Sequence, residues 1–507
     1  MAFDYKSFKK QIKYIRACVL LFGLLIHNPP FVQASDIVEK DMVDKIVSYI
    51  ELEMGRSEIP GLALAIVKGD TTIHVQGFGK ADENGRRVTG DTSFILGSTS
   101  KSFTAMAILQ LFDKGLIELD KPVQNYIPWF RVGDKDKSSE ITLRHLLNQT
   151  SGFSTETGRK KFTDGDTSPE ALEKGIRELK DVNLVTPVGS SFNYSNTNYD
   201  LLGLVVQTVS GMSYEKYIQK NIFDPLDMTH SYTDKESARN NGLATGYNYF
   251  IGKAFPTPDI PYPRRKKPAG YLISSAKDIS HYMIAQLNSG RYLDNKLLSD
   301  ASMQLYHTPE KQHYAMGWLS RQLNGKKLVM HKGLVANYRS EIIMIPEEGL
   351  GVVVLINGQD SVFDGTVRML PENVYLLLTG GKIRESRAGT FDKVFYAITL
   401  ILVLQLIGIP RTFLLIKRWK SGLPTLNRWS YFRFLVAPLV MSVLLSIAFL
   451  VVLPKANQMT VSDVLLFAPD ISWAAIISGT LALAWGIIRT VLVGNVLFKK
   501  STEEAEQ

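Results

Sequence analysis

Three long apolar segments near the C-terminus constrain the fold more than any other feature of this chain. They run from Val394 to about Ile416, from Leu435 to Leu453 and from Ile471 to about Leu497. Each can cross a bilayer core, which requires about 20 helical residues. We therefore expect residues 394–507 to form a membrane anchor of three transmembrane helices. The polar residues 382–393 are the expected linker to the preceding part.

The charges around these segments predict how the chain is oriented in the membrane. The loop at 454–470 contains one lysine and two aspartates, whereas the loop after the first segment contains five basic residues: Lys417, Arg418, Lys420, Arg428 and Arg433. Cytoplasmic loops are enriched in Lys and Arg, so the domain before Val394 is predicted to lie outside the cytoplasm. Arg411 and Arg489 lie toward the inner ends, where they can snorkel, so we interpret the helices as an anchor and not as a transport pathway.

The N-terminus has the three parts of a secretory signal. A basic stretch that ends at Arg16 is followed by the apolar run Ala17–Ile26 and by Val32-Gln33-Ala34. We expect a signal peptide at residues 1–34 that is cleaved after Ala34, with an uncleaved anchor as the alternative. Both outcomes place the next domain outside, so the expected location is the cell membrane, multi-pass, with that domain extracellular.

The charge distribution argues against a nucleic-acid partner. The net charge is +9, but residues 1–34 carry five basic and one acidic residue, and residues 394–507 carry ten basic and five acidic residues. The part between them is therefore neutral and has no basic footprint. The single cysteine, Cys18, lies in the predicted signal, which excludes a disulfide framework or a cysteine nucleophile in the main domain.

Residues 35–381 are predicted to form one α+β domain. Asp36–Glu53 has helical spacing of apolar residues. Five runs have strand character, and the first two flank a hairpin signal at Lys68-Gly69-Asp70: Leu62–Val67, Thr72–Gly77, Lys327–His331, Tyr338–Ile345 and Gly351–Ile356. Because strands flank a helical middle, we expect a sheet closed by N- and C-terminal strands, with an inserted helical subdomain.

Ser98-Thr99-Ser100-Lys101 is the first candidate catalytic motif. It precedes a helix-favouring run, Ser102 to Phe112, so Lys101 would lie one turn after Ser98 on the same helix face. A serine hydroxyl needs such a neighbour to become a nucleophile, and a backbone N–H at a helix start is free to polarise a carbonyl. The same spacing occurs at Ser7, Ser213 and Ser274, so for this motif alone a solvated helix surface remains the alternative.

Two further motifs accompany it, Tyr194-Ser195-Asn196 and His331-Lys332-Gly333. In this order and spacing the three motifs resemble the serine β-lactamase and penicillin-binding-protein superfamily, in particular its class C β-lactamase, DD-peptidase and esterase branch. Four additional strings fit the same resemblance: His145 to Gly152, Phe192-Asn193, Ala269 to Leu272 with Asp278, and Gly317-Trp318. The resemblance covers about residues 40–375 and implies a β-lactamase-like fold that does not include the anchor.

The resemblance implies a role for each motif residue. Ser98 would be the acylated nucleophile, Lys101 the amine of its proton network, and Tyr194 the base that relays protons to the leaving group. Lys101 and Tyr194 close together would favour the neutral amine and the phenolate near neutral pH. No cofactor is implied.

The resemblance also implies how substrate is bound. Asn196 would bind the substrate amide, and His331 and Gly333 would mark the strand beside the substrate. The backbone N–H groups of Ser98 and Leu334 would form the oxyanion hole. The alternative is that His331 is an ordinary strand residue without a role in substrate binding. His145 is expected to be structural, and the remaining histidines show no metal spacing.

The third motif departs from the Lys-Thr-Gly of the family, because His331-Lys332-Gly333 lacks the hydroxyl that helps to hold an antibiotic carboxylate. β-Lactamase activity is therefore a weaker expectation than peptidase or esterase activity. The basic run Arg264-Arg265-Lys266-Lys267 has two readings, a solvated loop or a patch at the rim of the site that guides anionic wall polymers such as teichoic acids.

Together these features predict a membrane-anchored extracytoplasmic serine hydrolase that forms an acyl-enzyme at Ser98. Its expected substrates are D-amino-acid amides or esters of the cell envelope, either peptidoglycan peptides or teichoic-acid D-alanyl esters. Membrane lipid is the other expected partner. The alternative is a penicillin-binding sensor or binding module, in which Ser98 is acylated but deacylation is slow.

Overall fold

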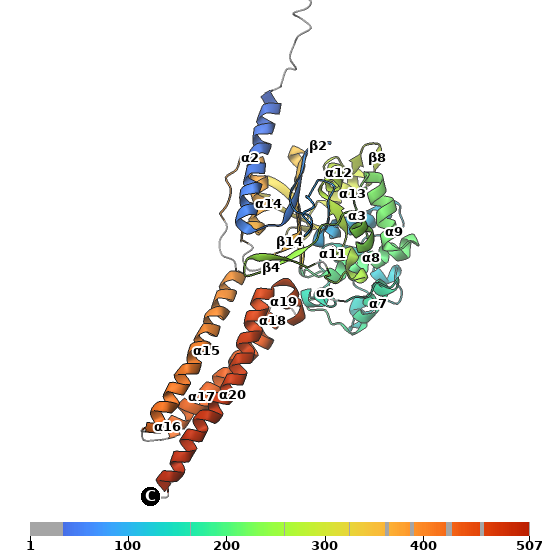
Figure 1. The fold of residues 1–507 in the computed structure, drawn as a ribbon. Coiled ribbons are helices and arrows are strands. Elements are labelled where there is room, and N and C mark those ends of the chain that lie inside the picture. Colours follow the sequence, from blue (N-terminus) through green and yellow to red (C-terminus); the bar gives the residue numbers. More distant parts are fainter. Residues whose placement is uncertain are drawn as a thin grey trace, which may run out of the picture.

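The protein is described by a computed structural model that covers residues 34–162, 164–257, 259–323, 325–359, 365–385, 390–421, 428–456 and 461–505. Apart from Ala34, the predicted signal peptide lies outside these residues. Figure 1 shows a mixed helix and sheet domain from which a bundle of long helices projects. The α+β class predicted from the sequence is confirmed.

A seven-stranded antiparallel sheet organises the domain. Its order is β2 (Thr71–Gly79), β1 (Gly61–Lys68), β13 (Leu350–Ile356), β12 (Tyr338–Ile345), β11 (Lys326–Val335), β10 (Trp318–Leu323) and β9 (Tyr314–Ala315). The predicted hairpin is β1–β2. Strand β1 also pairs with β13, from Leu62 opposite Ile356 to Lys68 opposite Leu350, so N-terminal and C-terminal strands of the domain join in one sheet, as predicted.

Both faces of this sheet are buried. Along β1, Ala63, Ala65 and Val67 belong to one hydrophobic core, whereas the alternate residues Leu62, Leu64 and Ile66 belong to the other. Side chains alternate between the faces of a strand, so a strand covered on both sides is apolar throughout. The second core lies under α2 (Ala34–Ser57) and α14 (Gly365–Leu378), and the first extends into the helical part of the domain.

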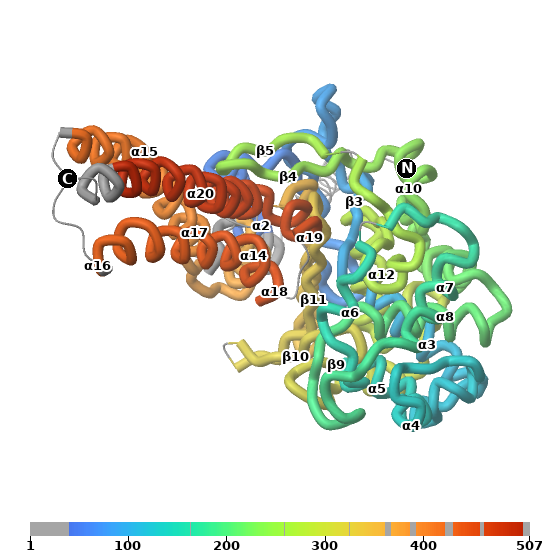
Figure 2. Tube along the Cα trace, turned by 90° about the horizontal axis from the view of Figure 1, so that it is seen from below, coloured from blue at the N-terminus to red at the C-terminus, as the bar shows by residue number. Residues whose placement is uncertain are grey.

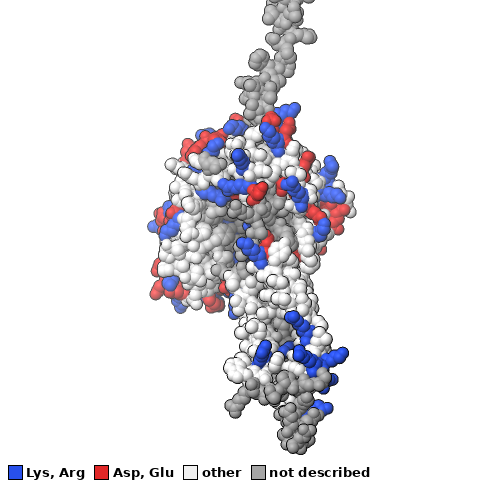
Figure 3. All heavy atoms as spheres, turned by 90° about the vertical axis from the view of Figure 1, so that its left-hand side faces the viewer, with Lys and Arg blue, Asp and Glu red and all other residues white. Residues whose placement is uncertain are grey.

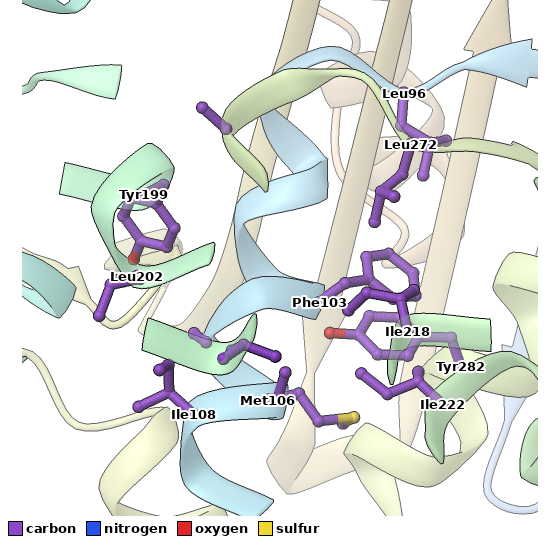
Figure 4. Close-up of a cluster of buried hydrophobic side chains, with 14 of the residues drawn as sticks. Leu96, Phe103, Met106, Ile108, Tyr199, Leu202, Ile218, Ile222, Leu272 and Tyr282 are labelled. Atoms are coloured by element: carbon purple, nitrogen blue, oxygen red, sulfur yellow. The ribbon is translucent and has the colours of Figure 1, made fainter. Parts of the chain in front are cut away.

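The helical part contains the largest core. Its helices are α3 (Ser100–Asp113), α4 (Lys135–Ser138), α5 (Leu143–Leu147), α6 (Thr155–Arg159), α7 (Ala171–Arg177), α8 (Asn196–Ser210), α9 (Tyr214–Ile218), α10 (Lys235–Asn240), α11 (Lys267–Gly270), α12 (Ala276–Leu287) and α13 (Asp300–Tyr306). Figure 4 shows Phe103 of α3 against Tyr282 of α12, and the two rings stack with centroids 4.0 Å apart. The packing fixes the helix that begins directly after Ser98.

Short strands complete the domain. They form three small sheets: β14 (Gly358–Gln359) with β4 (Tyr247–Phe250) and β5 (Lys253–Pro256), β3 (Ser93–Ile95) with β6 (Ile273–Ser275), and β7 (Arg291–Tyr292) with β8 (Asn295–Lys296). Strand β3 leads directly into the Ser98 turn, η1 (Gly97–Thr99), so its pairing with β6 helps to fix that turn.

The C-terminal part has three helical segments long and apolar enough to cross a membrane, at Asp392–Lys420, Trp429–Ala456 and Pro469–Lys499. They comprise α15 (Thr390–Ser421), the run α16 (Arg428–Tyr431), η8 (Phe432–Val436), α17 (Ala437–Ile447), η9 (Ala448–Val452) and α18 (Leu453–Ala456), and finally α20 (Pro469–Ala505). A short helix, α19 (Val461–Phe467), lies between α18 and α20. Many large apolar side chains of the bundle are exposed, among them Leu404 and Val491, as expected for a surface that faces lipid.

One boundary differs from the prediction at the site. Strand β11 was expected to end at His331 but continues through Lys332 and Gly333 to Val335. The reason is that Leu334 and Val335 still pair with Arg339 and Tyr338 of β12. Gly333 itself pairs with Ser340 and does not break the strand. Its lack of a side chain leaves room for the backbone at Leu96.

Replacing Phe103 with Ala should lower the free energy of unfolding by about 3–5 kcal/mol, because the ring is fully buried and stacked on Tyr282. Chemical denaturation of the full chain in detergent measures this loss. The matched control is Phe112→Ala on the same helix, where the side chain is 36% exposed and should cost less than half as much. Equal losses would show that α3 is not packed as described.

Candidate active site

Ser98 and Lys101 are neighbours at the start of α3. Ser98 lies in the turn η1, and the Nζ atom of Lys101 is 3.0 Å from the Oγ atom of Ser98. The predicted proximity across one helical turn is therefore confirmed. The side chain of Lys101 is fully buried, which is unusual for a lysine and costs free energy unless its nitrogen is neutral or well paired.

The partners of the Lys101 amine fit its neutral form. Besides Ser98 Oγ, Nζ lies 2.6 Å from the side-chain oxygen of Asn196 and 2.6 Å from the backbone oxygen of Ala269. These two oxygens only accept, so they take the two hydrogens of a neutral amine. The Ser98 hydroxyl can then donate to the amine lone pair. This arrangement is the one needed to take the proton of Ser98.

The electrostatic surroundings agree with this assignment. Burial lowers the pKa of Lys101 to about 7, with Asp200 opposing the shift and Lys266 adding to it. Asp200 and Lys266 form a buried ion pair with a nitrogen to oxygen distance of 2.7 Å. The sequence analysis assigned no role to Asp200. Asp200 lies four residues after Asn196, so the sequence could have placed both on one helix face near the site. Only the structure shows that Lys266 lies opposite Asp200.

Tyr194 lies on the other side of the nucleophile. Its hydroxyl hydrogen-bonds to the Ser98 side chain, and Lys101 Nζ lies 5.0 Å from the centre of its ring. Burial raises the pKa of Tyr194, and Tyr314 raises it further, while the Ser98 hydrogen bond and Arg159 oppose the change. The expected phenolate is therefore not favoured here, because burial stabilises the neutral phenol. The expected neutral amine is supported.

The Tyr194 loop is held by the string His145 to Gly152, which the sequence analysis had only matched to the family. Gln149 accepts a hydrogen bond from the backbone N–H of Ser195 at 2.9 Å, and its neighbour Ser151 donates to Asn198. His145 completes a capping box with Thr142 at the start of α5, so its predicted structural role is confirmed. Buried polar side chains thus fix the second motif against the helical subdomain.

Strand β11 packs against the Ser98 turn. A Cβ atom added at Gly333 would lie 1.8 Å from the backbone oxygen of Leu96, and one added at Gly97 would lie 2.4 Å from the amide nitrogen of Leu334. Gly97 also has a φ of +57°, which favours glycine. The two glycines let the backbones at Ser98 and Leu334 approach, which is the proximity that the predicted oxyanion hole requires.

His331 lies beside this site as a neutral imidazole. Its Nδ1 atom is 2.8 Å from the backbone oxygen of Lys332, which only accepts, so Nδ1 carries the hydrogen and Nε2 is an acceptor. The side chain is 3% exposed, and Nε2 has no hydrogen-bond partner among the described residues. Burial lowers the pKa of His331 to about 3, and Lys101 contributes to the shift.

The middle residue of the third motif faces away from the site. Lys332 lies opposite Glu341 of β12, and their side chains are 3.4 Å apart. By the alternation of a strand, both lie on the face of Met330 and Ile343, which pack under α2 and α14. Lys332 therefore does not offer its charge to a substrate at Ser98.

The string around Ala269 lies against the nucleophile. A Cβ atom added at Gly270 would be 3.9 Å from the amide nitrogen of Ser98, and the backbone N–H of Leu272 donates to the Ser100 hydroxyl at 3.0 Å. Since Ala269 also accepts from Lys101, this string forms one wall of the site.

Both readings of the basic run Arg264 to Lys267 are wrong. The last three of its side chains are buried, and all four are neutralised by carboxylates, so the run is neither a solvated loop nor a free anionic-polymer patch. Lys266 pairs with Asp200, Lys267 and Arg264 pair with Glu215, and Arg265 pairs with Asp164 and Glu178. A run of like charges is buried here because every member pairs with a carboxylate, and the sequence spacing does not reveal those partners.

The described residues contain no group of three or more His, Cys, Asp or Glu side chains that could hold a metal ion. The site instead consists of Ser98, Lys101, Tyr194, Asn196 and His331, with the backbone at Leu334. Three strings far apart in the sequence therefore meet at one place. Their catalytic and binding roles remain predictions.

Comparison with known proteins agrees with this geometry. Residues 46–370 match the family described as Beta-lactamase. Protein flp of Staphylococcus aureus (strain N315) is 31% identical over 333 residues, which cover 63% of this chain and 63% of that protein. An unguisins hydrolase of Aspergillus campestris is 26% identical over 343 residues, which cover 64% of this chain and 62% of that protein. The alignments thus span less than two thirds of these curated relatives.

A solved structure is also similar. The octameric penicillin-binding protein homologue from Pyrococcus abyssi superposes with a TM-score of 0.58 at 29% sequence identity, and the match covers 70% of this chain and 81% of that one. With the family match over residues 46–370, this structural likeness and the convergence of the three motifs lead to one conclusion: the chain belongs to the beta-lactamase family, whose members are typically serine hydrolases.

Proposed function

We propose that the chain is a membrane-anchored serine hydrolase that acts through an acyl-enzyme at Ser98 on D-amino-acid amides or esters of the cell envelope. The observation that carries the proposal is the buried Lys101 amine, whose two fixed acceptors leave its lone pair directed at the Ser98 hydroxyl. A serine beside a buried neutral amine is a nucleophile coupled to a base.

The acylation step follows from these positions. Ser98 Oγ attacks the substrate carbonyl while its proton passes to Lys101 Nζ. The backbone N–H groups of Ser98 and Leu334 would stabilise the oxyanion, each worth about a hundredfold or more in rate. Tyr194, as a neutral phenol, donates its proton to the leaving amine or alkoxide and is reprotonated from Lys101. Water then attacks the Ser98 ester, releases the acid and restores the hydroxyl.

The state of His331 narrows the substrate class. The Lys-Thr-Gly motif of the family has a cation at this position, whereas here a neutral, buried imidazole presents an acceptor that has no partner among the residues that the structure describes. With Lys332 on the opposite face of the sheet, the motif supplies no charge for a terminal carboxylate. This favours D-alanyl esters and internal peptide bonds over substrates with a free carboxylate beside the scissile bond.

The charge distribution supports an extracytoplasmic orientation. In Figure 3 the Lys and Arg side chains of the helical bundle gather at the end remote from the sheet domain. The exposed residues there include Lys417, Arg418 and Arg433. By the positive-inside tendency that end is cytoplasmic, so the site would face outward, where envelope polymers are found.

Ser98→Ala should abolish acylation by a labelled β-lactam and hydrolysis of an activated ester, and Lys101→Ala and Tyr194→Phe should each slow acylation by about a hundredfold or more. On the full chain, intact-mass spectrometry detects the acyl-enzyme, and rapid-mixing kinetics measure the rates of acylation and of ester hydrolysis. The control is Ser213→Ala, since Ser213 has a lysine at the same spacing but only caps α9, so its acylation rate should not change. Full acylation of Ser98→Ala would contradict the nucleophile assignment.

The acylation rate should rise as the pH increases through about 7 and level off above about 8. Below that range Lys101 is protonated and cannot accept the Ser98 proton, whereas His331 and Tyr194 stay neutral throughout. Rate constants for a labelled β-lactam between pH 5.5 and 9 test this. A rate that does not change between pH 6 and 8 would exclude Lys101 as the titrating base.

Substrate charge gives a further test. A D-alanyl ester or a peptide amide should be cleaved with a kcat/KM about tenfold above that of the matched substrate with a free terminal carboxylate, since no motif cation pairs with that carboxylate. His331→Lys should reduce this preference. Turnover of either substrate distinguishes the hydrolase from the sensor alternative, in which a stoichiometric adduct at Ser98 would persist without product release.

A further inference from the structure

We infer that α19, the short helix between the second and third spans of the anchor, is part of the support of the active site, with Asp463 as a positioning residue that acts on Tyr194 through Arg159. The effect on catalysis rests on the proposed function, because it concerns the phenol that serves Ser98. The anchor would then complete the site in addition to tethering it.

Helix α19 is docked on the catalytic domain from two sides. The rings of Phe467 in α19 and Phe162 meet edge to face with centroids 6.0 Å apart. On the other side, Asn248 of β4 donates a hydrogen bond to the backbone oxygen of Leu466 at 2.9 Å. Figures 1 and 2, viewed at right angles to each other, both place α19 beside the catalytic domain near α6 and β4. An apolar contact and a backbone hydrogen bond together fix its position.

The start of α20 adds a further contact between the anchor and the catalytic domain. The carboxylate of Asp470, which is buried, accepts the backbone N–H of Ile251 at 2.9 Å. Ile251 has a φ of +51° in the turn between β4 and β5, a left-handed conformation that is strained for a β-branched residue. The surroundings must stabilise such a turn, and here a residue of the anchor does so.

An electrostatic link then runs from α19 to the reacting groups. Arg159, at the end of α6, is partly buried, and burial lowers the pKa of its guanidinium, while Asp463 and Tyr194 oppose that change. A partly buried guanidinium is stabilised by a carboxylate near it, and Asp463, itself only 7% exposed, provides such a charge from the anchor. Arg159 in turn lowers the pKa of Tyr194. The three groups therefore act on one another in sequence.

Helix α6 passes this constraint to the second motif. Thr155 donates a hydrogen bond to the backbone oxygen of Tyr194 at 2.8 Å. A Cβ atom added at Gly158 would lie 2.4 Å from the backbone nitrogen of Asn196, so α6 and the motif are in close backbone contact. A helix of five residues has little stability of its own. Its position therefore depends on its surroundings, and Phe162, three residues after the end of α6, packs against Phe467 of α19.

The experiment uses the full chain in lipid nanodiscs and measures two properties. The first is acylation of Ser98 by a labelled β-lactam, separated into the binding constant and the acylation rate constant. The second is hydrogen exchange of the peptides that cover residues 155–162 and 193–198. Asp463→Asn should lower the acylation rate constant between about fivefold and about a hundredfold, leave binding within about twofold, and raise exchange in both peptides.

Matched variants separate charge from packing. Asp463→Glu keeps the counter-charge and should retain the acylation rate within about threefold. Arg159→Gln should slow acylation, and the double variant with Asp463→Asn should be no slower than the slower single variant, since both act on one link. The exposed pair Arg239 and Asp259, 3.0 Å apart, is the control, and Asp259→Asn should change neither readout. If Asp463→Asn lowers the thermal midpoint of the chain, Asn248→Ala, which releases α19 from β4, should still slow acylation.

If the Asp463→Asn variant has the same acylation rate and the same hydrogen exchange as the wild-type chain, the inference is overturned. Equal slowing by Asp463→Asn and Asp463→Glu also overturns it, because the charge would then have no part in positioning. If the wild-type chain is not acylated at Ser98, the proposed function fails. The exchange readout still decides the structural inference in that case, since it does not depend on the reactivity of Ser98.

Discussion

The site depends on one physical constraint: the nitrogen of Lys101 is removed from water and, within the described part of the chain, its hydrogen-bond partners are all oxygens. A lysine in that position is expensive to charge, so its neutral form and its affinity for the Ser98 proton follow from burial. The enclosure is built from separate parts of the chain. Asn196 opens α8 and Ala269 lies in α11, and each supplies one oxygen.

The sheet supplies the rigidity that this enclosure needs. Because β1 pairs with β13, the two ends of the domain are joined, and cores on both faces hold the central strands. Strand β11 extends this frame to the Ser98 turn, where Gly333 and Gly97 allow the backbones to approach. The basic residues Arg265, Lys266 and Lys267 are also held in fixed positions, because each is buried in an ion pair with a carboxylate.

The membrane anchor also contributes contacts to the catalytic domain. Its helices present apolar side chains outward, but the connection between α18 and α20 contacts the catalytic domain through Phe467, Leu466 and Asp470. A loop that only joined two spans would not need a buried aspartate beneath a strained turn. Catalytic domain and anchor therefore share an interface, and the proposal that Asp463 supports the site is a consequence of where that interface lies.

The sequence by itself determined the elements with strong local patterns: the apolar spans, the β1–β2 hairpin, the helix that carries Lys101, and the three motifs whose spacing indicated the family. These signals depend on periodicity and on neighbours within a few residues. It did not show that β11 passes Gly333, that Lys332 faces away, that Arg264 to Lys267 are buried, or that Asp463 acts electrostatically on Arg159. Those contacts join residues distant in the chain, and only the tertiary structure decides them, because burial and pairing of charges depend on which surfaces pack together.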